Sequence, residues 1–215
     1  MKHAVMFDMD GVLVNSEYCM RHSAILALRE WGVDACHEDF IEFTGMGEDS
    51  FVGGVARKHG LEYIPAMKER SYELYDRLAP EEVEVAPGTK EMLRELRRRG
   101  YRLSVASAAD HVKVMINLRC LGVSPEIFDA VTTGSEIVNK KPDPEIYLST
   151  AARLCEDPAD CVVVEDALAG IAAGRAAGSD CIGVTSTFTE QELLAAGAKR
   201  VVARTPLLLD IIDTL

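Results

Sequence analysis

Acidic residues follow two short apolar runs in this sequence, at the point where each run ends. Asp8 and Asp10 follow Ala4–Phe7, and Glu165 and Asp166 follow a later apolar run. Acids that are buried together raise one another's pKa, because each negative charge disfavours the next. A hard divalent cation, which prefers oxygen ligands, would relieve this repulsion. The pattern therefore predicts a metal site, provided that the fold brings the two runs together.

A hydroxyl group and a lysine stand at comparable positions. Ser107 ends the apolar run 103–106, and Lys141 lies in the loop after the run 130–133. Taken singly, Ser107 is more typical of a helix cap, Lys141 of a surface lysine, and an aspartate after a strand of a turn. Their placement beside the four acids changes this interpretation, because a divalent cation together with one lysine would balance the buried negative charge, so we interpret the set as functional.

The elements that must position these residues follow a repeat of strand and helix. Most of the apolar runs are continuous rather than alternating, as expected for parallel strands that are covered on both faces. Gly100, Gly122 and Gly178 stand where helix C-terminal caps are expected. We expect strands at residues 4–7, 103–106, 130–133, 162–164, 182–184 and 201–203, and helices at 89–99, 111–121, 144–154, 168–177 and 190–196. The sequence thus predicts an α/β fold with an open, Rossmann-like parallel sheet, whose ligands bind beyond the carboxyl ends of the strands.

One connection is far longer than a crossover requires. Residues 11–100 separate the first acidic loop from the second strand, whereas about a dozen residues suffice for a crossover. Residues 17–77 have helical patterns and contain no convincing strand. We therefore expect an all-helical insertion at residues 15–84, and an α/β core formed by residues 1–14 and 85–215.

The charge balance narrows the class of partner. The chain has 35 Asp and Glu against 23 Lys and Arg, a formal net charge of −12. This balance argues against a nucleic-acid partner and against docking on an anionic membrane, because both require a basic surface. No apolar run approaches the ~20 residues of a membrane span. We therefore expect a small-molecule partner, and any phosphate binding should depend on a local cation or metal.

The cysteines indicate a reducing environment. The chain has 6 cysteines, none in a C-x-x-C pair, and its 5 histidines do not stand at zinc-ligand spacing beside them. Cys161 and Cys181 fall in runs that we expect to be core strands. We therefore predict free thiols and a cytoplasmic location, with a monomer as the default oligomeric state.

The residues of this constellation lie in motifs that resemble those of the haloacid dehalogenase-like superfamily. Residues 7–17, FDMDGVLVNSE, resemble its first motif, and Ser107, the KPDP of residues 141–144 and the VED of residues 164–166 match its second, third and fourth motifs in order and spacing. The match covers nearly the whole chain and is closest to the β-phosphoglucomutase-like phosphatase branch. The expected helical insertion resembles the small cap domain of that family.

The resemblance implies a Mg²⁺-dependent phosphatase that acts on a small, sugar-phosphate-like monoester. Asp8 would attack phosphorus and form an aspartyl-phosphate, and Asp10 would protonate the leaving alcohol and then deprotonate the attacking water. Mg²⁺ would be held by the Asp8 carboxylate, the Asp10 backbone carbonyl and Asp166. Glu165 is either a further ligand or a residue that supports the ligands.

The resemblance also implies where phosphate and substrate are held. Ser107 and neighbouring backbone N–H groups, including that of Ala108, would hold phosphate oxygens, and Lys141 would neutralise charge on them. The Gly45-Met46-Gly47 segment is either a substrate loop of the cap or an ordinary turn between helices.

Two alternatives remain open. A sugar-phosphate mutase of the β-phosphoglucomutase type would carry a cap histidine where this chain has Met20, and His22 points elsewhere on a helix. Such a mutase would also carry an arginine in the cap loop, where residues 44–49 offer no base, and a lysine near Ala108-Ala109-Asp110. A non-catalytic binding protein on the same fold is the other alternative, although no motif is damaged. The dehalogenases of the family lack the second aspartate, so Asp10 favours phosphoryl chemistry.

Overall fold

The computed structural model describes residues 2–43 and 47–215, and their contacts divide the chain into two compact units. The core unit consists of Met1–Asn15, Val85–Ala108 and Leu121–Leu215. The helical unit consists of Ser16–Glu84 and Ala109–Cys120. Each unit has its own interior and is described separately.

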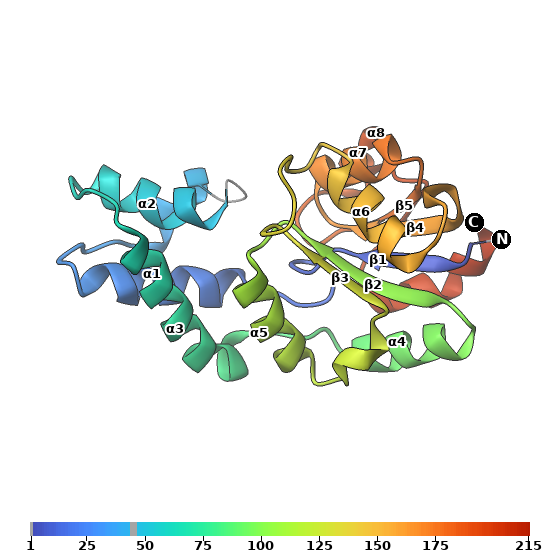
Figure 1. Cartoon of the computed structure of the whole chain (residues 1–215), viewed down its shortest axis with the longest axis horizontal. Helices are drawn as coiled ribbons and strands as arrows, with labels where there is room; N and C mark the ends of the chain where they lie inside the picture. The colour runs from blue at the N-terminus through green and yellow to red at the C-terminus, as the bar shows by residue number, and fades with distance from the viewer. Residues whose placement is uncertain (1, 44–46) are drawn as a thin grey trace. The chain divides into compact units, whose positions relative to one another are not determined.

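The core unit is built on a parallel sheet, as the sequence predicts (Figure 1). Its strands are β1 (Ala4–Phe7), β2 (Arg102–Ser107), β3 (Ala130–Thr133), β4 (Cys161–Glu165), β5 (Asp180–Val184) and β6 (Arg200–Val202). They lie in the order β3-β2-β1-β4-β5-β6, and each pairs in parallel with its neighbours. The direction of the strand order reverses between β1 and β4, which is the point where open sheets of this kind bind ligands.

Helices cover both faces of this sheet, which explains the continuous apolar strands. The helices of the core unit are α4 (Thr89–Arg98), α6 (Glu145–Leu154), α7 (Leu168–Ala176) and α8 (Glu190–Ala196). Figure 1 shows α6, α7 and α8 on one face of the sheet and α4 on the other. Met6 and Val163 of the sheet share an apolar cluster with Ile146 and Ile171 of the covering helices. Short 3₁₀ turns complete the unit at Pro125–Ile127, Pro158–Asp160, Thr205–Asp210 and Ile212–Thr214.

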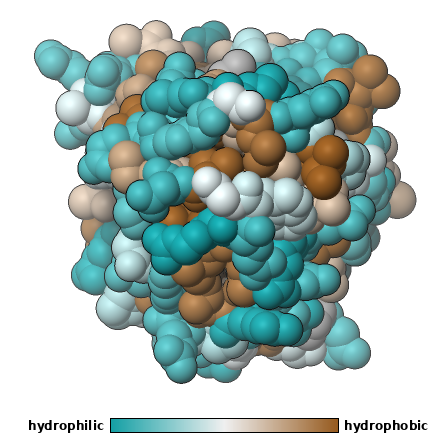
Figure 2. All heavy atoms as spheres, turned by 90° about the vertical axis from the view of Figure 1, so that its left-hand side faces the viewer, coloured by the Kyte–Doolittle hydropathy of each residue, from teal (hydrophilic) through white to brown (hydrophobic). Residues whose placement is uncertain are grey.

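The helical unit encloses an apolar cluster of its own. Its elements are α1 (Glu17–Arg29), the 3₁₀ turn His37–Phe43, α2 (Glu48–Lys58), α3 (Pro65–Glu82) and α5 (His111–Leu121), the last residue of which is counted with the core unit. Phe40, Val52 and Tyr75 are fully buried in this cluster. The face in Figure 2 mixes hydrophilic and apolar residues. Apolar side chains exposed singly are ordinary on a protein surface.

The helical unit differs in one respect from the insertion that the sequence suggests at residues 15–84. It also contains residues 109–120, which the sequence analysis assigns to the core. The reason is α5, since Tyr75 of α3 donates a hydrogen bond of 2.5 Å to Asn117 of α5, and Ile116 joins the apolar cluster. The helical unit is therefore made of two separate segments of the chain.

The ends of the predicted elements agree closely with the structure. The strands at 4–7 and 130–133 and the helices at 111–121 and 190–196 have the predicted ends, and the others differ by at most two residues at an end. Gly100, Gly122 and Gly178 adopt positive φ angles of 92°, 64° and 93°, as expected of residues that end helices. Within the described residues, every helix is too short or too polar to cross a bilayer.

Candidate active site

The acids identified in the sequence meet where β1 and β4 end. Phe7 pairs with Val164, and the Asp8 backbone N–H donates to the Val164 carbonyl at 3.0 Å. Parallel pairing at this level brings the following residues together, and carboxylate oxygens of Asp8, Glu165 and Asp166 lie within 4.8 Å of one another. All three residues are buried. Three of the four acids predicted for the metal site therefore lie close enough together to hold a metal ion, and Asp10 is not among them.

Burial sets the electrostatics of these acids. It raises the pKa of Asp8 well above its usual range, although the neighbouring Lys141 opposes the shift. Burial likewise raises the pKa of Asp166, to about 7, against the effect of a hydrogen bond from Thr187. Three carboxyl groups in so small a space favour a cation among them, and their oxygens are the ligands that Mg²⁺ prefers.

Lys141 is the positive charge that the site already contains. Its Nζ lies 2.6 Å from Asp8 Oδ1 and 2.6 Å from Glu165 Oε1, and it also donates to the Ala106 carbonyl at 3.2 Å. Burial lowers the pKa of Lys141, but the carboxylates of Asp8 and Glu165 outweigh burial and hold that pKa well above its ordinary range. The side chain is therefore an ammonium ion that holds the Asp8 carboxylate in one orientation.

Glu165 has its hydrogen-bonding capacity filled by protein donors. Its Oε1 accepts from Lys141 at 2.6 Å and from the Tyr147 hydroxyl at 3.0 Å. Its Oε2 accepts from the backbone N–H groups of Asp166 at 3.0 Å and Ala167 at 2.9 Å. A carboxylate offers about four lone-pair sites, so these donors occupy all of them. Although Glu165 lies close enough to the other acids to share a metal, its contacts indicate that it positions Lys141.

A glycine allows Glu165 to sit against α7. A Cβ atom on Gly170 would lie only 1.8 Å from Glu165 Oε1. The first turn of α7 thus approaches the carboxylate more closely than any other residue would permit.

The loop that carries Asp10 is a tight turn directly after β1. The Gly11 N–H donates to the Val14 carbonyl at 2.7 Å, and Gly11 adopts a φ of 78°. A Cβ atom on Gly11 would lie 2.1 Å from Asp166 Oδ2, so this position needs glycine for its conformation and for its space. The turn therefore packs the Asp10 segment directly against the carboxylate of Asp166.

Ser107 and Ala108 stand at the same edge of the sheet. β2 is the neighbour of β1 on the side away from β4, and Phe7 pairs with Val105. Ser107 is the last residue of β2 and is buried. The chain after β3 approaches closely at Gly134, where a Cβ atom would lie 2.0 Å from the Ala108 carbonyl oxygen. The predicted phosphate-binding residues thus follow the strand next to the one that carries Asp8.

The predicted cap loop is described only in part. Gly45 and Met46 lie outside the described residues. Gly47 precedes α2 with a φ of 85° and belongs to the helical unit. Met20 and His22, the two residues compared above with the cap histidine of a mutase, both lie in the helical unit. Met20 is buried, and His22 Nδ1 pairs with Glu82 at 2.8 Å within the helical unit.

Sequence reasoning missed several residues that support the site. Tyr147 lies on α6, three residues beyond the KPDP motif, and nothing in a helical pattern marks it. Ser186 and Thr187 follow β5, and the rule that polar residues after strands meet at one edge could have found them. The Ser186 hydroxyl donates to the Gly11 carbonyl, and the Thr187 hydroxyl donates to Asp166 Oδ2 at 2.5 Å. The Thr205 hydroxyl donates to the Val12 carbonyl of the same turn at 2.5 Å.

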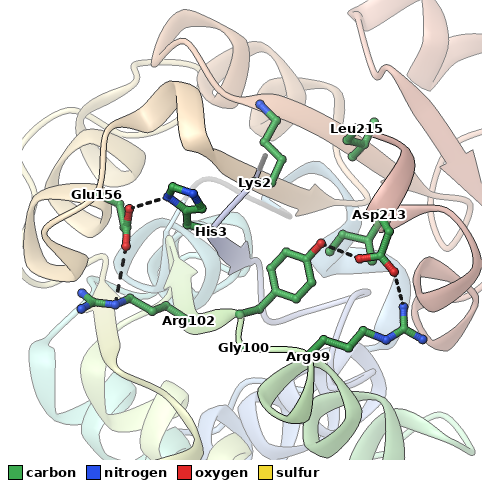
Figure 3. Close-up of a pocket in the computed structure, with 10 residues that line it drawn as sticks. Lys2, His3, Arg99, Gly100, Arg102, Glu156, Asp213 and Leu215 are labelled. Carbon is green, nitrogen blue, oxygen red and sulfur yellow. Dashed lines mark hydrogen bonds and ion pairs between the residues drawn. The ribbon is translucent and has the colours of Figure 1, made fainter.

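A hollow of about 480 Å³ lies at the opposite edge of the sheet, where the strands begin (Figure 3). Several of its charged side chains pair with one another. Arg99 contacts Asp213 at 2.7 Å, and Arg102 contacts Glu156 at 3.5 Å. Tyr101 also donates to Asp213, at 2.8 Å. Each of these acids therefore meets a cation, which is a different arrangement from the cluster of acids around Asp8.

Comparison with known proteins agrees with this geometry. The chain is 43% identical over 202 residues to the protein SUPPRESSOR OF QUENCHING 1, chloroplastic, of Arabidopsis thaliana; the match covers 92% of this chain but only 19% of that protein's length. It is 30% identical over 205 residues to a phosphorylated carbohydrates phosphatase of Thermotoga maritima, with 93% of each chain covered. The crystal structure of CbbY from Rhodobacter sphaeroides in complex with phosphate superposes with a TM-score of 0.85 at 28% identity, covering 97% of this chain and 96% of that one.

A family model gives the most direct assignment. The model of the haloacid dehalogenase-like hydrolases matches residues 2–178, which contain all the strands and loops that bring the acids, Ser107 and Lys141 together. The match thus extends over most of the sheet as well as over the motifs. Fold, site geometry and relatives agree, and this chain belongs to the haloacid dehalogenase-like hydrolase family.

Proposed function

We propose that this chain is a phosphoric monoester hydrolase that depends on Mg²⁺ and acts on a small phosphorylated metabolite with a sugar-like body. The observation that carries the proposal is the contact between Lys141 and Asp8, 2.6 Å long, beside Asp166 at the point where the strand order reverses. The similarity to a phosphorylated carbohydrates phosphatase supports the class of substrate.

Asp8 is the nucleophile in this proposal. Its carboxylate oxygen attacks phosphorus while the bond from phosphorus to the leaving alcohol oxygen breaks, and an aspartyl-phosphate forms. Lys141 holds Asp8 Oδ1 and carries a positive charge to the phosphoryl oxygens, which lowers the cost of the charge that builds up there. Ser107 and the backbone N–H of Ala108 bind the same phosphoryl oxygens.

Asp10 moves the protons. It donates a proton to the leaving alcohol and then takes a proton from the water that attacks the aspartyl-phosphate. Asp10 comes two residues after Asp8 in the chain, directly before the turn at Gly11. Water attack releases inorganic phosphate and restores the Asp8 carboxylate.

The donor set at the site fits a hard divalent cation. Asp8, Asp166 and the Asp10 carbonyl would hold Mg²⁺, which when bound would neutralise charge on the phosphoryl group. Burial raises the pKa of Asp8 and of Asp166, which is consistent with a cation that would stabilise both carboxylates in their charged form. Glu165 is left out of this ligand set, because Lys141, Tyr147 and two backbone N–H groups use its oxygens.

Hydrolysis of p-nitrophenyl phosphate tests the proposal. We expect activity that requires Mg²⁺, disappears with EDTA and falls at least about a thousandfold in Asp8→Asn, since the amide is a poor nucleophile. Asp213→Asn, at the opposite edge of the sheet, is the matched control and should keep wild-type activity. Full activity in Asp8→Asn would overturn the covalent mechanism, and a wild-type chain without any activity would favour a binding protein.

Incubation with β-glucose 1-phosphate separates a phosphatase from a mutase. Release of inorganic phosphate is the expected result, whereas net formation of glucose 6-phosphate would overturn the assignment. A panel of phosphorylated metabolites, ranked by kcat/KM, would then identify the substrate.

We also propose that the chain acts as a monomer in a reducing compartment such as the cytoplasm. All six cysteines are free in the structure, and Cys161 and Cys181 are buried in strands β4 and β5. Light scattering during size-exclusion chromatography, with and without a reducing agent, tests whether the chain is a monomer and whether its free thiols link chains together. A mass of one chain under both conditions is expected.

A further inference from the structure

The loop between β5 and α8 brings two successive hydroxyl groups to the site. β5 is the neighbour of β4, and residues 185–189 follow it at the edge where Asp166 lies. The Ser186 hydroxyl donates to the Gly11 carbonyl, and the Thr187 hydroxyl donates to Asp166 Oδ2 at 2.5 Å. One loop therefore contacts both the turn after β1 and the acid after β4.

Asp166 is confined from two sides by these contacts. Thr187 binds its Oδ2, and the same oxygen would lie 2.1 Å from a Cβ atom on Gly11. Asp166 itself is 6% exposed. Its carboxylate is therefore held between the hydroxyl of one loop and the backbone of another, with the orientation of Oδ2 fixed by a hydrogen bond.

The Thr187 hydroxyl does not cap the helix that follows it. The N-terminal cap of α8 is Thr189, whose hydroxyl accepts from the Glu192 N–H at 3.3 Å while Glu192 Oε2 accepts from the Thr189 N–H at 2.9 Å. The start of the helix is thus served by a different threonine in the same loop. The hydroxyl of Thr187 is directed at Asp166 instead.

We infer that Thr187 is a positioning residue for the divalent cation, because its hydroxyl fixes Asp166 Oδ2 and so presents the carboxylate to the cation in one orientation. A carboxylate that can rotate loses part of its binding free energy when it becomes a ligand, and groups that orient ligands commonly change metal affinity by about 10–100-fold. The inference rests on the proposed function for the cation itself.

The test compares three variants by direct metal binding. Thr187→Val keeps the shape of the side chain but removes the hydroxyl, Thr187→Ser keeps the hydroxyl, and Thr189→Val removes the cap of α8 from the same loop. Each metal-free protein is titrated with Mn²⁺, with free ion counted by electron paramagnetic resonance, and with Mg²⁺ by calorimetry. Circular dichroism and thermal melts establish that each variant is folded.

We expect Thr187→Val to raise the dissociation constant at least about tenfold, with Thr187→Ser within about twofold of wild type. Thr189→Val should lower the melting temperature and leave the dissociation constant unchanged. In the p-nitrophenyl phosphate assay, excess Mg²⁺ should restore the kcat of Thr187→Val.

Four results would count against this role. Wild-type affinity in Thr187→Val, or equal loss in Thr187→Ser, would overturn the inference and leave the proposed function standing. Equal loss in Thr189→Val would show that loop stability rather than the hydroxyl matters. A wild-type protein that binds neither ion would remove the metal from the proposed function, and the inference with it.

Discussion

The two edges of the central sheet both carry ion pairs, but these pairs differ in how deeply they are buried. At the carboxyl edge, Lys141 contacts Asp8 at 2.6 Å, and the two side chains are 9% and 12% exposed. At the amino edge, Arg99 contacts Asp213 at 2.7 Å, but these side chains are 27% and 60% exposed (Figure 3). The distances are nearly the same, so distance alone does not distinguish a reactive ion pair from a surface one.

Burial and charge balance make the difference. Around Asp8, three buried acids share one lysine, and burial raises the pKa of Asp8 and of Asp166. At the amino edge each acid has a cation beside it, and water screens the pair. A site with more buried acids than cations needs an additional cation, and with that cation it can bind an anionic substrate. A surface on which each acid is paired with a cation has no such requirement.

Among the changes that compare the two edges, removal of Lys141 should give the largest effect and tests the contrast most directly. Lys141→Met leaves Asp8 and Glu165 buried without their cation, which should cost about 3–5 kcal/mol of stability and at least about a hundredfold in kcat/KM. Urea unfolding and p-nitrophenyl phosphate hydrolysis measure the two effects. Arg99→Met, at the amino edge, is the control and should leave kcat/KM unchanged. If both variants lose stability equally, the two edges do not differ as argued.

The pH dependence of metal binding should give an intermediate effect. Burial raises the pKa of Asp166 to about 7 in the metal-free chain, so below that pH a proton competes with the cation. Affinity for Mg²⁺ should therefore fall as the pH drops below 7, by up to about tenfold per pH unit. Calorimetry between pH 5.5 and pH 8.5 measures this dependence.

The raised pKa of Asp166 also predicts how the stability of the metal-free protein changes with pH. An acid whose pKa is higher in the folded than in the unfolded chain binds more protons when folded, so stability falls as pH rises from its ordinary pKa toward 7. Metal-free protein should therefore melt lower at pH 8 than at pH 6, and Mg²⁺ should restore much of the loss at pH 8. Equal Mg²⁺ affinity at both pH values would contradict the assignment of Asp166 as a ligand.

The sheet and the residues at its carboxyl edge could be predicted well from the sequence, because both depend on local patterns. β1 and residues 161–164 of β4 are apolar and buried, so the acids at the ends of these two strands could be located without a structure. Which unit α5 joins depends instead on a contact between Tyr75 and Asn117, which are 42 residues apart in the chain. No local pattern records such a contact.

The roles of adjacent acids also required the structure. Glu165 and Asp166 are neighbours in sequence, and the sequence left open whether Glu165 joins Asp166 as a ligand or supports the ligands. The chain turns them toward different surroundings: Glu165 lies against Gly170 of α7, and Asp166 lies against Gly11. The contact of Thr187 with Asp166 likewise depends on the strand order, because Thr187 reaches Asp166 only when β5 lies beside β4.

The smallest predicted effect lies at the amino edge and concerns the backbone. Cys155 ends α6 and, with a φ of 55°, is the residue other than glycine that adopts a positive φ within the described chain. This left-handed conformation costs an ordinary side chain about 1–2 kcal/mol, of which glycine would give back part to its greater freedom when unfolded. Cys155→Gly should therefore stabilise the protein by about 0.5–1 kcal/mol and leave kcat/KM unchanged. The free energy of unfolding from urea titration, with Cys155→Ala as the control that keeps a Cβ atom, measures the gain. A loss of activity in Cys155→Gly would show that the amino edge is coupled to the carboxyl edge through β4. Such coupling would contradict the view that the paired ions of the amino edge and the clustered acids of the carboxyl edge act independently.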